Sequence, residues 1–111
     1  MRLFVAIVKD HRQVEDILMG FLDLGVRGGT VLEGRGMGEM VSMEVPIFAG
    51  LRALSPGGAK DSYVILSAME DGIVDGAFRL VDEVCGGLEN AGTGIAWTIP
   101  IDRIRGTAGG F

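Results

Sequence analysis

Three runs of this sequence are apolar at nearly every position, and they constrain the fold more than any other feature. They are Arg2–Val8, Ser62–Ala68 and Ile95–Ile99, the last of which stops at Pro100. Side chains alternate between the two faces of a strand, so a strand that is apolar throughout needs cover on both faces. We therefore predict three strands in a sheet that is covered on both sides.

Two amphipathic helices are predicted between these strands. Asp10 with Gln13 three residues later resembles a capping box, and Gly25 is a typical helix end. Between them apolar residues recur at intervals of three and four: Val14, Ile17, Leu18, Phe21 and Leu22. The second helix is predicted from about Gly72 to Leu88. Its apolar side carries Val74, Ala77, Phe78, Val81, Val84, Cys85 and Leu88.

A further strand is predicted at Val26–Glu33, entered through Gly28 and Gly29 and left at Gly34. The order is then strand, helix, strand, strand, helix, strand, which fits two split crossover units. We predict an α+β, ferredoxin-like βαββαβ fold in a single domain of residues 1–111. Its four-stranded antiparallel sheet would carry both helices on one face.

A long loop is predicted between the second and third strands, at about 37–60. Loops of this length in a small domain are usually functional or disordered. This loop is too apolar for a simple solvated linker, with Met37, Met40, Val41, Met43, Val45, Ile47, Phe48, Leu51 and Leu54. We interpret Met40, Met43, Ile47 and Phe48 as a surface that binds a partner protein. Alternatively, the alternation of apolar residues from Val41 to Ile47 indicates that this part forms a strand pair or packs against an oligomer of the chain.

Composition excludes several classes of function. The formal net charge of -5 and the pI near 4.7 argue against a nucleic-acid partner. The single cysteine, Cys85, and the single histidine, His11, give no histidine–cysteine metal cluster and no Ser-His-Asp triad. We therefore expect no enzyme activity. The run Leu3–Val8 is too short for a signal peptide or a membrane span, so a cytoplasmic location without membrane insertion is expected.

The two predicted helices can cover only one side of the sheet. The second apolar side therefore needs another subunit, and we predict a closed homo-oligomer whose sheets face inward.

The order of elements and the local motifs resemble the PII signalling proteins, also called nitrogen regulatory P-II proteins, over nearly the whole chain. In that family the second strand reads Thr-Val-x-Glu before glycines that open the T-loop. Here Thr30, Val31, Leu32 and Glu33 lead into Gly34, Gly36 and Gly38. The family's B-loop reads Gly-Asp-Gly-Lys before an apolar strand that ends in proline. Here Gly92, Thr93, Gly94 and Ile95 precede Ala96, Trp97, Thr98, Ile99 and Pro100.

The resemblance implies a homotrimer with ATP, ADP or AMP as effector in the clefts between subunits. It also implies a T-loop that binds a target protein, such as a transporter or a metabolic enzyme, in nitrogen regulation. Carried over by position, the nucleotide-binding residues are Thr30, Gly36, Gly38, Gly92, Thr93, Gly94, Arg103 and Arg105. The last two resemble the Arg-x-Arg of the family's C-terminal segment.

Two positions depart from the family pattern. Ile95 stands where the family has the B-loop lysine, and Glu39 stands where it often has an arginine. These departures leave an alternative function open, which is an oligomeric protein-interaction module that does not sense nucleotides.

Overall fold

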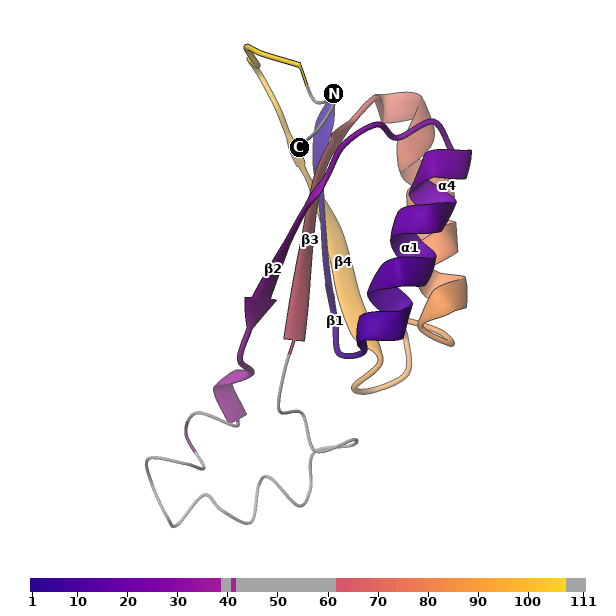
Figure 1. Ribbon diagram of the computed structural model, residues 1–111, viewed down its shortest axis with the longest axis vertical. Coiled ribbons are helices and arrows are strands. Elements are labelled where there is room, and N and C mark those ends of the chain that lie inside the picture. Colours follow the sequence, from indigo (N-terminus) through magenta and orange to yellow (C-terminus); the bar gives the residue numbers. More distant parts are fainter. Residues whose placement is uncertain (39–40, 42–61, 108–111) are drawn as a thin grey trace.

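The computed structural model describes residues 1–38, 41 and 62–107. Its elements follow the order β1 (Arg2–Val8), α1 (His11–Asp23), β2 (Thr30–Gly34), β3 (Ser62–Met69), α4 (Asp71–Val84) and β4 (Gly94–Pro100). The strands form one antiparallel sheet in the order β2-β3-β1-β4, and both helices lie on the same face of it (Figure 1). The predicted ferredoxin-like α+β fold is confirmed.

The first helix begins and ends as its sequence predicts. The carboxylate of Asp10 accepts a hydrogen bond from the backbone N–H of Arg12 at 2.9 Å, which caps the first turn. Gly25 adopts a φ of 90° directly after the last turn, and the N–H of Val26 donates to the carbonyl of Phe21 at 2.9 Å. This is the Schellman arrangement, in which a glycine with positive φ ends the helix.

The core lies between the helices and one face of the sheet. Phe4 is fully buried, and its ring packs edge-on against Phe21 of α1 at 5.7 Å and tilted against Phe78 of α4 at 4.9 Å. The other buried residues of this core are Ala6, Val8, Val14, Ile17, Val26, Ile65, Met69, Ala77, Val81 and Cys85. Helix α1 approaches α4 closely at Gly20, where a Cβ atom would collide with the side chain of Leu80.

The predicted boundaries of β2 and α4 were wrong. Strand β2 begins at Thr30 and not at Val26, because Val26 completes the end of α1 and is buried in the core. Helix α4 ends at Val84 and not at Leu88, because Gly86 and Gly87 take φ values of 74° and 103°. Their N–H groups donate to the carbonyls of Glu83 and Asp82, which forms a second Schellman end.

Smaller differences concern β3, β4 and the long loop. Strand β3 continues to Met69, and β4 extends from Gly94 to Pro100, so each is slightly longer than predicted. The predicted loop of about 37–60 includes Met37 and Gly38. The structure shows a helical backbone at these two residues. Most of the remaining predicted loop lies outside the described residues.

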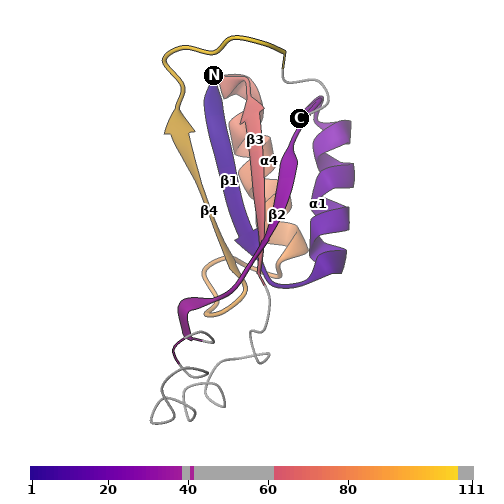
Figure 2. The ribbon, with the colours of Figure 1, turned by 60° about the vertical axis from the view of Figure 1, so that its left-hand side comes forward.

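The face of the sheet opposite the helices is apolar and has no covering layer among the described residues (Figure 2). Paired residues of antiparallel strands project to the same face, so the register gives this open face three cross-strand rows. They are Ile95–Ile7–Val64–Leu32, Trp97–Val5–Leu66–Thr30 and Ile99–Leu3–Ala68. Ile95 is 56% exposed, Ile99 47% and Trp97 37%. Only Thr30 is polar in these rows, as the sequence predicts for a sheet that needs a second cover.

Candidate functional site

The two glycine-rich segments predicted to bind a ligand emerge at the same end of the sheet. Gly34 pairs with Ser62 at the end of β2, and Gly94 pairs with Val8 at the start of β4. Since Val8 also pairs with Tyr63, these residues lie at one end, on the two outer strands. Three strand spacings separate β2 from β4, which is about 14 Å. Within one chain the two segments therefore share an end of the sheet but do not form one pocket.

The glycines that follow β2 have open space around them. A Cβ atom at Gly36 or Gly38 would meet nothing within 4 Å, and neither residue is among the glycines with positive φ in the described part of the chain. Gly34, Gly36 and Gly38 therefore do not form a turn that requires positive φ. The exposed Arg35 lies between these glycines and adds a cation at this end of the sheet.

The segment before β4 is ordered by its own hydrogen bonds. The hydroxyl of Thr93 lies 2.8 Å from the carbonyl oxygen of Gly87 and 2.9 Å from that of Asn90. A hydroxyl has one proton, so these two acceptors use the whole donor capacity of Thr93. Gly92 has a φ of 77°, which favours glycine at this turn.

Gly94 has a structural role, and its part in nucleotide binding stays a prediction. A Cβ atom there would lie 3.1 Å from the carbonyl oxygen of Ile7 and 3.4 Å from the sulfur of Cys85. The backbone therefore approaches its neighbours closely at the first residue of β4, and a side chain has little room.

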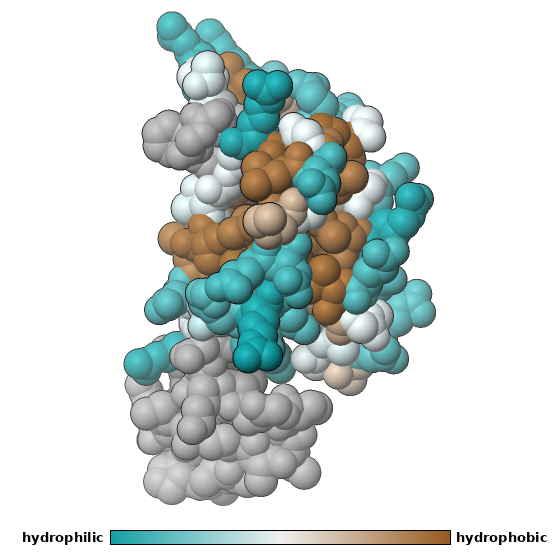
Figure 3. All heavy atoms as spheres, turned by 45° about the vertical axis from the view of Figure 1, so that its right-hand side comes forward, coloured by the Kyte–Doolittle hydropathy of each residue, from teal (hydrophilic) through white to brown (hydrophobic). Residues whose placement is uncertain are grey.

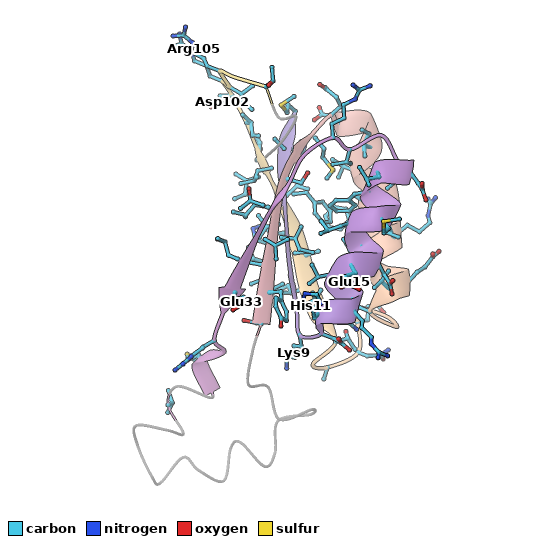
Figure 4. The ribbon with its side chains drawn as sticks, viewed as in Figure 1. Lys9, His11, Glu15, Glu33, Asp102 and Arg105 are labelled. Carbon is cyan, nitrogen blue, oxygen red and sulfur yellow. The ribbon has the colours of Figure 1, made fainter. Side chains whose placement is uncertain are left out.

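The remaining predicted nucleotide-binding residues lie away from this end. Thr30 is exposed and faces the open side of the sheet, four residues before Gly34. Arg103 and Arg105 follow β4, whose seven residues span about 20 Å. Figure 4 accordingly shows Arg105 and Asp102 at the opposite end of the molecule from Lys9 and Glu33. A single chain does not bring these arginines to the glycine segments. The predicted partner-binding residues Met40, Met43, Ile47 and Phe48 lie outside the described residues.

The structure adds Lys9, His11 and Tyr63 to the glycine end of the sheet. Lys9 directly follows Val8, the residue that pairs with Gly94. The His11 ring packs edge-on against Tyr63 at 5.7 Å, and its Nδ1 lies 3.3 Å from the carboxylate of Glu15. Lys9 was missed because the family motif directs attention to the lysine after Gly94. Its position directly after a strand was the available signal.

A further group that could react is the thiol of Cys85. Cys85 is buried, and this burial, followed by the negative charge of Asp82, raises the pKa of its thiol. In the described part of the chain, no three histidine, cysteine, aspartate or glutamate side chains are grouped to hold a metal ion. No helix within the same residues is both long and apolar enough to cross a membrane.

The structure defines the chain as a ferredoxin-like α+β protein. The connection after β2 and the glycine-rich turn before β4 leave the same end of its sheet, on the two outer strands. Comparison of the sequence with models of known protein families and with curated proteins gives no match.

Proposed function

We propose that this chain is a PII-like regulatory protein that assembles as a homotrimer and binds an adenine nucleotide between subunits. The observation that carries the proposal is the open apolar face, whose three rows need a cover that one chain does not supply. A second copy carries the same apolar surface and is therefore the simplest cover. The proposal includes the family's wider setting: nitrogen regulation, control of a transporter or metabolic enzyme, and a cytoplasmic location.

Assembly also explains how separated residues could form one site. Arg103 and Arg105 lie at the end of the sheet opposite to Gly92–Gly94, so they would reach the glycine segments of a neighbouring chain and not their own. Lys9 and Arg35 would add positive charge near the nucleotide phosphates, in place of the lysine that Ile95 replaces.

Regulation would follow from a shift between loop conformations. A nucleotide that contacts Gly36 and Gly38 favours whichever conformation of the T-loop it binds more tightly. A tenfold difference in affinity corresponds to about 1.4 kcal/mol, enough to change the fraction of molecules ready to bind a target.

Calorimetric titration with ATP, ADP and AMP tests nucleotide binding directly. We expect saturable heat with at least one of them at millimolar concentration or below. Lys9→Ala should weaken binding about tenfold, the effect of one lost charge-assisted hydrogen bond. Arg79→Ala removes an exposed cation on α4 and serves as the matched control, with unchanged affinity expected. Equal effects of the two substitutions would contradict the role of Lys9.

A second candidate is an oligomeric protein-interaction module that does not sense nucleotides. It is favoured by Ile95, which is 56% exposed and continues the apolar open face where a phosphate-binding cation would be expected. The Thr93 hydroxyl, which already donates within its own turn, also supports it. Absence of heat and of a thermal shift with all three nucleotides, in a protein that still assembles, would establish this candidate over the first.

A further inference from the structure

We draw no further inference here: the strongest candidate, the apolar cleft of about 250 Å³ between α1 and residues 26–29 on the helix side, where Figure 3 shows apolar side chains gathered, carries none because nothing in the structure shows what covers it.

Discussion

Cys85 lies at the junction of α4 and β4, at the edge of the core, where its sulfur faces the backbone of Gly94. Its burial raises the pKa of the thiol, and the nearby charge of Asp82 acts in the same direction. A thiolate is the reactive form of cysteine, so burial and the raised pKa both favour a role for this residue as a small apolar side chain of the core.

The raised pKa of Cys85 predicts a loss of stability in alkaline solution. An unfolded chain releases the thiol proton near pH 8.5, the ordinary value for cysteine, whereas the folded chain holds it to higher pH. The contribution of the protonated Cys85 thiol to the free energy of unfolding is therefore complete below the thiol pKa of the unfolded chain. It is lost as the pH rises through the thiol pKa of the folded chain. Urea denaturation of wild type and Cys85→Ala from pH 7 to 10 measures it. A parallel decline in both proteins would show that Cys85 has no part in this loss.

The two helices differ in how their first turns are capped. Asp10 caps α1 through its carboxylate, whereas Glu70, at the equivalent position of α4, makes no side-chain capping hydrogen bond. The two helices thus offer a matched comparison of a working and a non-working cap within one protein.

We predict that Asp10→Ala lowers the free energy of unfolding by about 1 kcal/mol, because it leaves a first-turn N–H without its partner. Glu70→Ala should change that free energy by less than about 0.5 kcal/mol. Urea denaturation followed by circular dichroism measures both. Equal losses would mean that the Asp10 hydrogen bond contributes nothing specific to the stability of the fold.

Sequence patterns predicted the type and order of the elements better than their ends. Strand β1 and the start of α1 follow directly from an unbroken apolar run and a capping residue. The start of β2 does not, because Val26 looks like a strand residue but is buried as part of the end of α1. Gly28 is joined to β3 by the buried hydroxyl of Ser67, which donates to the Gly28 carbonyl at 2.7 Å, a contact between residues 39 positions apart. No local pattern reveals such a contact.

The candidate site was predictable only where its residues are local in the sequence. Gly92, Thr93 and Gly94 form one turn, and that turn was recognised from its composition. Arg103 and Arg105 were grouped with it by family resemblance, although β4 carries them to the other end of the sheet. Distances of this kind depend on the strand order and on assembly, which a linear motif does not encode.

At the scale of the whole molecule, the open apolar face of the sheet determines how we expect the chain to associate. Helices cover one face of the sheet, and the other face carries three apolar rows. We predict that Trp97→Asp weakens self-association at least about tenfold, because it puts a charge in the middle row. Met19→Asp, a change of equal charge on an exposed residue of α1, should leave association unchanged. Sedimentation velocity over a concentration series measures both variants, and equal effects would remove the open face as the interface.

The central claim is that the open face of the sheet is buried between copies of this chain. Sedimentation equilibrium of the wild-type protein at micromolar concentration tests it most directly. We expect a trimer, with three times the chain mass of 11.7 kDa, about 35 kDa. A single species at the mass of one chain would show that the open face is not an interface between copies, and the proposed nucleotide site between subunits would be lost with it.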